Sequence, residues 1–197
     1  MSKTNTFTYV LKIFLPLLLI CAVIAGVVSG VQVLTKDAIA ANEAKVEAEK
    51  EQKKLDAIAD IYGEGVKFEK LTELPEGIDE IRVATDENGK KLAVATLTVK
   101  GYSKGLQVFV AYGSEGEIRR VMILASNETT GIGSKVSDED YLKDYNGLSG
   151  VIDFGNKDDD LDKIAGATIS SKAVLGAVNT ATEELLGLGY IEKGGNN

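Results

Sequence analysis

Residues 80–126 read EIRVATDENGKKLAVATLTVKGYSKGLQVFVAYGSEGEIRRVMILAS, and the pattern of this segment predicts a β-sheet. β-Branched and polar residues alternate along it, which is the period of a β-strand. The pair Asn88-Gly89 is a strong signal for a two-residue hairpin, and residues 114–116 mark a second turn. Short turns pair neighbouring strands in antiparallel fashion. We therefore expect four antiparallel strands, at residues 80–86, 91–100, 106–112 and 117–125.

The chain that follows these strands changes to loops and helices. We expect a short helix near residues 137–144, and residues 151–168 (VIDFGNKDDDLDKIAGAT) predict a strand followed by an acidic loop. From Ser171 to Tyr190 apolar residues recur at helical spacing, and two glycines close the element. The predicted fold class is therefore α+β, an antiparallel sheet with flanking helices.

The N-terminal part of the chain contains a long uncharged segment. The 23 residues from Ile13 to Thr35 (IFLPLLLICAVIAGVVSGVQVLT) carry no charge, and about 20 apolar residues cross a bilayer as a helix. A cleaved signal peptide is the alternative, but its apolar core is typically only about 7–15 residues long, which favours a retained anchor. Residues 36–62 are rich in Ala, Glu and Lys and predict a helical stalk whose charges form a solvated face.

Composition excludes several classes of function. The formal net charge of -8 argues against a nucleic-acid partner, because phosphate binding needs a basic surface. The chain has no histidine, which removes Ser-His and Cys-His catalysis and most zinc sites. Its single cysteine, Cys21, lies in the apolar segment, so no four-cysteine iron–sulfur cluster can form. Any redox chemistry therefore needs an organic cofactor.

Residues 156–167 are acidic but do not fit a calcium loop. Leu161 stands where an EF-hand needs glycine for its sharp turn, and Ala167 stands where it needs a bidentate glutamate. We therefore expect no metal site.

Residues 164–171 (IAGATISS) place hydroxyl side chains at the expected start of the last helix. Free N–H groups and the positive end of a helix dipole suit a phosphate there, so Thr168 is a candidate for binding or being esterified by one. The alternative is that Thr168, Ser170 or Ser171 is a helix N-cap, which is a very common use of serine and threonine. The residues alone leave both interpretations open.

A glycine-containing loop, residues 127–136 (NETTGIGSKV), lies between a strand and a helix. It lacks the Gly-Lys-Ser/Thr ending of a Walker loop and the third glycine of a dinucleotide fingerprint. Gly131 and Gly133 would let the backbone approach a flat ligand or would simply form a turn.

Taken together, these stretches resemble the FMN-binding domain shared by the G subunit of the Rnf complex and the C subunit of sodium-translocating NADH:quinone reductase. The resemblance covers about residues 90–190, with the apolar segment also in place. It is carried by residues 101–118 (GYSKGLQVFVAYGSEGEI), by residues 127–136, and by the spacing Asp162-x-x-Ala165-Gly166-Ala167-Thr168.

The resemblance implies that Thr168 carries the cofactor. In the family, FMN is joined through its phosphate to the threonine of a Gly-Ala-Thr motif, and a flavin transferase makes the ester from FAD. Ala165 stands where the family usually has Ser or Thr, and Thr130 where it commonly has proline, but the acceptor hydroxyl is intact. The loop from Glu128 to Gly133 is expected against the flavin ring. The other expected FMN-binding residues are Gly166, Ala167, Ile169, Ser170, Asp162, Glu128, Thr129, Gly131 and Gly133.

The resemblance further implies a membrane-anchored covalent flavoprotein that relays electrons within an Rnf-type, ion-translocating ferredoxin–NAD oxidoreductase. Its partners would be the other membrane subunits of that complex and, during maturation, the flavin transferase. With no histidine and no evident acid–base pair, the chain is not expected to be catalytic alone. The alternatives are a component of sodium-translocating NADH:quinone reductase and a non-redox assembly module whose Thr168 is only a cap.

The lysines on both sides of the apolar segment do not decide its orientation. The resemblance implies a single-pass protein of the cell membrane whose C-terminal domain faces the extracytoplasmic side. The predicted parts are a short cytoplasmic N-terminus (1–12), a transmembrane helix (13–35), a helical stalk (36–62), an FMN-binding domain (63–192) and a tail (193–197).

Overall fold

The computed structural model of the chain describes residues 3–155 and 161–192. Most of the expected acidic loop, residues 156–160, and the tail at 193–197 lie outside the described residues. The chain divides into two compact units, Met1–Glu49 and Lys50–Asn197.

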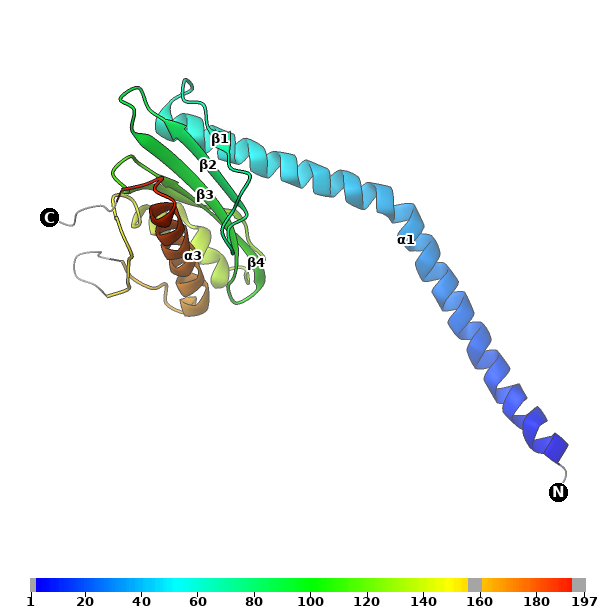
Figure 1. Cartoon of the computed structure of the whole chain (residues 1–197). Helices are drawn as coiled ribbons and strands as arrows, with labels where there is room; N and C mark the ends of the chain where they lie inside the picture. The colour runs from blue at the N-terminus through cyan, green and yellow to red at the C-terminus, as the bar shows by residue number, and fades with distance from the viewer. Residues whose placement is uncertain (1–2, 156–160, 193–197) are drawn as a thin grey trace. The chain divides into compact units, whose positions relative to one another are not determined.

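The first unit is helical. Helix α1 runs from Lys3 to Tyr62, so the expected apolar segment and the expected stalk are parts of one continuous helix (Figure 1). It contains an 18-residue window with a mean hydropathy of 2.7, none of which is buried. By length and composition α1 is able to cross a membrane. Large apolar side chains such as Phe14 and Leu19 are about 60% exposed, as a lipid-facing surface requires.

The second unit is built on a five-stranded antiparallel sheet in the order β1-β2-β3-β4-β5. All four expected strands are confirmed, while β1 is a two-residue strand that the sequence pattern did not predict. At the expected hairpin the Asp86 carboxylate accepts hydrogen bonds from the N–H groups of Asn88 and Lys90, both at 2.8 Å, and Gly89 has a positive φ of 80°. The strands are β1 (Glu69–Lys70), β2 (Glu80–Thr85), β3 (Lys91–Lys100), β4 (Lys104–Tyr112) and β5 (Ile118–Ala125).

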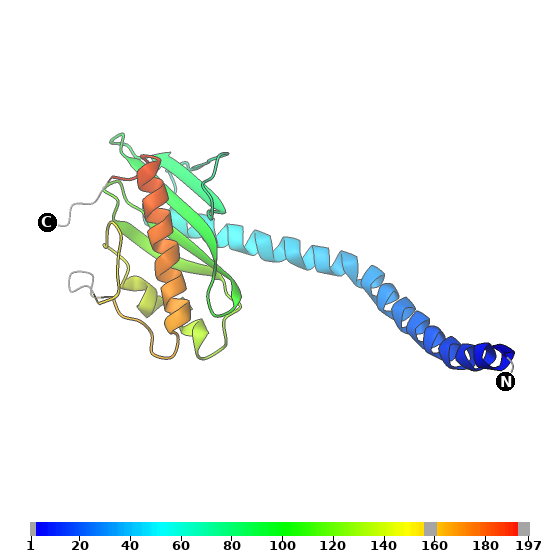
Figure 2. The same ribbon diagram turned by 60° about the horizontal axis from the view of Figure 1, so that its bottom comes forward.

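Both faces of the central strands are buried. Helix α3 (Thr168–Gly187) packs on one face, and the end of α1 packs on the other (Figures 1 and 2). Alternate residues of a strand point to opposite faces, so β3 and β4 divide their side chains between two cores. The core under α3 receives Ala95, Leu97, Val108 and Val110, and the core under α1 receives Val94, Phe109 and Ala111, together with Ala57 and Ile58 of the helix.

The end of the expected stalk is therefore part of the domain, and the expectation of a solvated charged face is wrong there. Lys54 is only 6% exposed and forms ion pairs with Glu51 at 3.0 Å and with Glu80 at 3.2 Å. Arg82, 5% exposed, lies between the same two carboxylates, and Lys70 adds a 3.0 Å pair with Glu80. Burial raises the pKa of Glu51, but hydrogen bonds from Arg82 and Lys54 outweigh it and lower that pKa to about 2.

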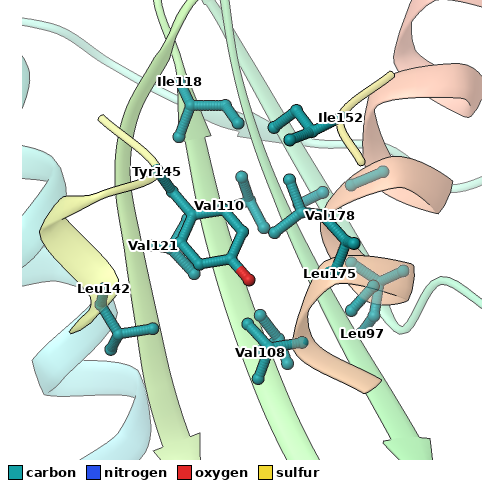
Figure 3. Packing of buried hydrophobic residues seen from close by; sticks show 14 of the residues in the cluster. Leu97, Val108, Val110, Ile118, Val121, Leu142, Tyr145, Ile152, Leu175 and Val178 are labelled. Atoms are coloured by element: carbon teal, nitrogen blue, oxygen red, sulfur yellow. The ribbon is translucent and has the colours of Figure 1, made fainter. Parts of the chain in front are cut away.

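The short helix expected near 137–144 is present in two pieces, the 3₁₀-helix η1 (Gly133–Ser137) and α2 (Glu139–Lys143). Tyr145 follows α2 and is fully buried. In Figure 3 its ring lies beside Val110 and Val121 of the sheet, and Val178 approaches from α3. The segment after β5 thus covers the same face of the sheet as α3.

The strand expected within residues 151–168 is absent from its described part, because residues 151–155 form turns and bends. The reason is a side chain that takes the place of a neighbouring strand. Asn179 of α3 accepts a hydrogen bond from the Ile152 N–H at 2.9 Å and donates one to the Ile152 carbonyl at 2.8 Å. Ile152 remains in the core, at 1% exposure, without a strand partner.

Candidate cofactor-binding site

The first residue of α3 is Thr168, three residues earlier than the expected start at Ser171. The N-cap position is taken by Ala167, with φ -115° and ψ 30°, and no side chain caps the helix there. The N-cap interpretation of Thr168, Ser170 and Ser171 is therefore wrong, because all three lie inside the helix. The first N–H groups of a helix have no partner within it, so this end keeps its capacity to bind an anion.

The three hydroxyl side chains at this helix start have different surroundings. Ser170 is 1% exposed and donates a 2.6 Å hydrogen bond to Oε2 of Glu128. Ser171 is fully buried, and its Oγ accepts a 3.2 Å hydrogen bond from the Ile164 N–H. Thr168 is exposed. Of the three hydroxyls, the Thr168 side chain is thus the one that a reagent in solution can reach.

Thr168 lines a pocket of about 480 Å³, which falls within the usual size range of ligand sites, about 300–1,000 Å³. Three segments that are distant in sequence form it: the turn between β3 and β4, the loop after β5, and the start of α3. Most of its lining residues are apolar or small, as a flat aromatic ligand requires. The lining residues are Tyr102, Glu128, Thr129, Ile132, Gly133, Gly166, Ala167, Thr168, Ile169 and Ser170.

The structure brings most of the expected site residues together in this pocket. Gly131 and Asp162 are not among the lining residues. Gly131 has a positive φ of 79°, and its N–H donates to Oγ of Ser134 at 2.9 Å, so its glycine is explained by a turn. Asp162 is exposed.

Among the lining residues, Tyr102 was not expected from the sequence, and Ile132 was expected only as part of the loop from Glu128 to Gly133. Tyr102 lies in the β3–β4 turn and is 68% exposed, while Ile132 lies between two glycines and is 54% exposed. Together with Ile169, which is 56% exposed, they put three large apolar side chains on the pocket wall. The sequence did offer one signal for these residues. Large apolar side chains are usually buried, so one that stands inside a glycine-containing turn indicates a contact surface.

Glu128 lines the pocket and is also held by hydrogen bonds within the protein. It is 8% exposed, its Oε1 accepts a 3.1 Å hydrogen bond from the Ser103 N–H, and its Oε2 accepts the Ser170 hydroxyl. Gly101 and Gly133 pack against its carboxylate so closely that a β-carbon on either glycine would clash with it. The carboxylate is thus enclosed by protein on several sides.

Comparison with known proteins identifies this part of the chain. Residues 101–183 match the FMN-binding domain family, and the match contains both the pocket and Thr168. This segment is similar to an FMN-binding domain. The expected resemblance to the flavin-binding subunits is thereby confirmed.

Several curated relatives of the chain have names that refer to one kind of complex. The G subunit of an ion-translocating oxidoreductase complex from Shewanella piezotolerans is 27% identical over 103 residues, covering 48% of this chain and 49% of the relative. The G subunit of a proton-translocating ferredoxin:NAD(+) oxidoreductase complex from Clostridium ljungdahlii is 31% identical over 108 residues, covering 52% and 58%. The Na(+)-translocating counterpart of Acetobacterium woodii is 31% identical over 120 residues, covering 56% and 57%. The chain spans about half the length of the curated relatives it matches.

Proposed function

We propose that this protein is a membrane-anchored flavoprotein that holds FMN as a phosphoester on Thr168 and relays electrons within an ion-translocating ferredoxin–NAD oxidoreductase. The observation that carries the proposal is the exposed Thr168 hydroxyl at the first residue of α3, on the wall of a pocket within the FMN-binding domain. The neighbouring hydroxyls of Ser170 and Ser171 are buried and hydrogen-bonded, which supports Thr168 as the acceptor.

The residues present fit FMN in two respects. The uncapped N-terminus of α3 offers N–H groups and a positive dipole end to the phosphate. The apolar side chains of Tyr102, Ile132 and Ile169 offer surface to an isoalloxazine ring. When bound, FMN supplies the capacity to accept and pass on electrons, and the protein supplies position and electrostatics.

Attachment is a group transfer without change of oxidation state. The Thr168 oxygen forms a bond to the FMN-side phosphorus of FAD, the pyrophosphate bond breaks, and AMP leaves. The hydroxyl proton passes to a base of the flavin transferase, which is the partner required for maturation. What the chain itself contributes is an accessible hydroxyl held at a fixed place on a folded helix.

The names of the relatives support a role beside other membrane subunits, because those relatives are subunits of ion-translocating complexes. Helix α1 supports anchoring in the membrane. That the protein is single-pass, with its domain on the extracytoplasmic side, is part of the proposal and follows from the family resemblance. A covalent bond suits that side, where a dissociated cofactor would be lost.

The test of attachment compares intact masses of the full chain after co-expression with a flavin transferase. We expect an FMN adduct on the wild type and on Thr168→Ser, which keeps the hydroxyl, and none on Thr168→Ala. Thr180→Ala is the matched control, because Thr180 lies on the same helix but outside the pocket lining. Equal flavin content in Thr168→Ala and the wild type would refute the proposed attachment site.

The test of the relay supplies NADH or reduced ferredoxin to the flavinylated full chain in detergent. We expect slow or no flavin reduction in the isolated chain and rapid reduction in the assembled complex. Rapid direct reduction of the isolated chain by either donor would overturn the relay, because the chain would then be the entry point for electrons.

A further inference from the structure

Glu128 is the one acidic residue that is buried in the part of the chain that the structure describes. A buried carboxylate is costly unless hydrogen bonds compensate its lost hydration. Here the two oxygens bind two different segments: Oε1 accepts the Ser103 N–H at 3.1 Å, and Oε2 accepts the Ser170 hydroxyl at 2.6 Å. The side chain thus joins the β3–β4 turn and the first turn of α3 to the loop after β5.

The space around this carboxylate is provided by glycines. A β-carbon on Gly101 would clash with Oε1, and one on Gly133 would lie 2.7 Å from Oε2 and 3.3 Å from Oγ of Ser170. Neither glycine has a positive φ, so their backbone conformations are open to other residues. The close packing around Glu128, and not the backbone conformation, therefore explains why both positions have glycine.

We propose that Glu128 is a positioning residue for flavinylation, which holds the first turn of α3 so that Thr168 faces the flavin transferase. The inference rests on the proposed attachment of FMN to Thr168. It also changes the role expected for Glu128 from the sequence, because both of its carboxylate oxygens already have partners within the protein.

Helix geometry explains how a contact at Ser170 controls Thr168. With 3.6 residues per turn, two residues of separation rotate a side chain by about 200° around the helix axis. Ser170 therefore points into the protein while Thr168 points outward, in agreement with their buried and exposed states. The hydrogen bond that holds Ser170 in the protein interior therefore also sets the direction in which Thr168 points.

The experiment measures the rate of FMN incorporation into the full chain in detergent, with purified flavin transferase and FAD. Glu128→Gln keeps the shape of the side chain but removes its charge and one acceptor oxygen. We expect the rate to fall about tenfold, which corresponds to about 1.4 kcal/mol, because a smaller fraction of molecules presents Thr168 correctly. Ser170→Ala removes the other partner of this hydrogen bond and should also slow FMN incorporation. Because the two residues contact each other, the double variant should be slowed by less than the sum of the two single effects.

Glu117→Gln is the matched control. Glu117 also packs tightly against a glycine, Gly113, and accepts a backbone N–H, that of Glu115 at 3.1 Å, but it lies outside the pocket lining. We expect this variant to be flavinylated at the wild-type rate.

A second readout needs no flavin. Hydrogen exchange at the Ser171 N–H, which binds the Ala167 carbonyl at 2.9 Å, should be faster in Glu128→Gln than in the wild type and unchanged in Glu117→Gln. Unchanged exchange and an unchanged rate in Glu128→Gln would overturn the positioning role. If the wild type takes up no FMN at Thr168, the proposed function fails, and the exchange comparison still decides whether Glu128 holds the helix start.

Discussion

Alanine at Gly133 is expected to damage the site through one displaced carboxylate. The new β-carbon would lie 2.7 Å from Oε2 and 3.0 Å from the β-carbon of Glu128, both far inside normal contact distance. Glu128 must then move and give up its 2.6 Å hydrogen bond with Ser170. Overpacking of this kind costs about 1–3 kcal/mol, so we expect the free energy of unfolding to fall by that amount. Flavinylation should slow as the first turn of α3 loosens.

Gly131→Ala is the comparison variant. Gly131 lies in the same loop as Gly133, but alanine destabilises it through backbone conformation and not through a clash. Its β-carbon would meet nothing within 4 Å, but φ is +79°, a left-handed conformation. That conformation costs a non-glycine residue about 1–2 kcal/mol, of which about 0.4–1 kcal/mol is offset by lower entropy of the unfolded chain. Gly131→Ala should therefore lose up to about 1.5 kcal/mol of stability while keeping the wild-type rate of FMN incorporation.

Urea unfolding of the full chain in detergent gives the two free energies, and intact mass against time gives the two rates. Flavinylation of Gly133→Ala at the wild-type rate would refute the reasoning from Glu128. Equal slowing of both variants would refute it as well, because stability alone would then control the reaction. A wild-type rate in Gly131→Ala with an altered flavin spectrum would place the flavin ring on the Gly131 backbone, as the sequence suggested.

Two further predictions concern contacts of the domain outside the pocket lining. Burial raises the pKa values of Glu51 and Glu80, but hydrogen bonds from basic neighbours outweigh it and lower both, that of Glu51 to about 2. The stabilisation from Glu51 is therefore full above the unfolded value of 4.5 and is lost as the pH falls toward 2, and the stabilisation from Glu80 is lost in the same direction. The free energy of unfolding in urea should decrease less between pH 6 and pH 3 in Glu51→Gln than in the wild type. An equal decrease in both would contradict this prediction. Asn179→Ala leaves the N–H and carbonyl of Ile152 without their partner and should cost about 1–3 kcal/mol in the same assay, whereas a cost near zero would show that water replaces the amide.

The sheet could be predicted from the sequence because its signals are local. Alternation, Asn88-Gly89 and the turn at 114–116 placed all four long strands within two residues of their observed bounds. The strand expected in residues 151–168 was wrong because Asn179, far away in the sequence, takes the partner's place. The burial of Lys54 was missed for a similar reason, since its compensation by Glu80 is visible only after folding.

The site could be predicted in part. The Gly-Ala-Thr motif and the loop at 127–136 led to most of the pocket lining, because a family resemblance carries information about residues that meet in space. Tyr102 was missed because nothing in its own turn indicates that α3 begins beside it. The start of α3 was placed too late because helix signals favour serine or threonine at the N-cap, and the structure has Ala167 there.

That last difference explains how a threonine at a helix start can remain reactive. At the N-cap, a threonine oxygen accepts a hydrogen bond from the N–H of the second or third helical residue, which engages both the hydroxyl and a phosphate-binding group. At the first helical position, behind Ala167, Thr168 is free of that role and the N–H groups of the turn stay available to an anion. The helix loses about 1 kcal/mol of capping stability by this arrangement. The buried bonds of Ser170 to Glu128 and of Ser171 to Ile164 secure the helix start instead, so that the exposed hydroxyl and the stabilising ones are different residues.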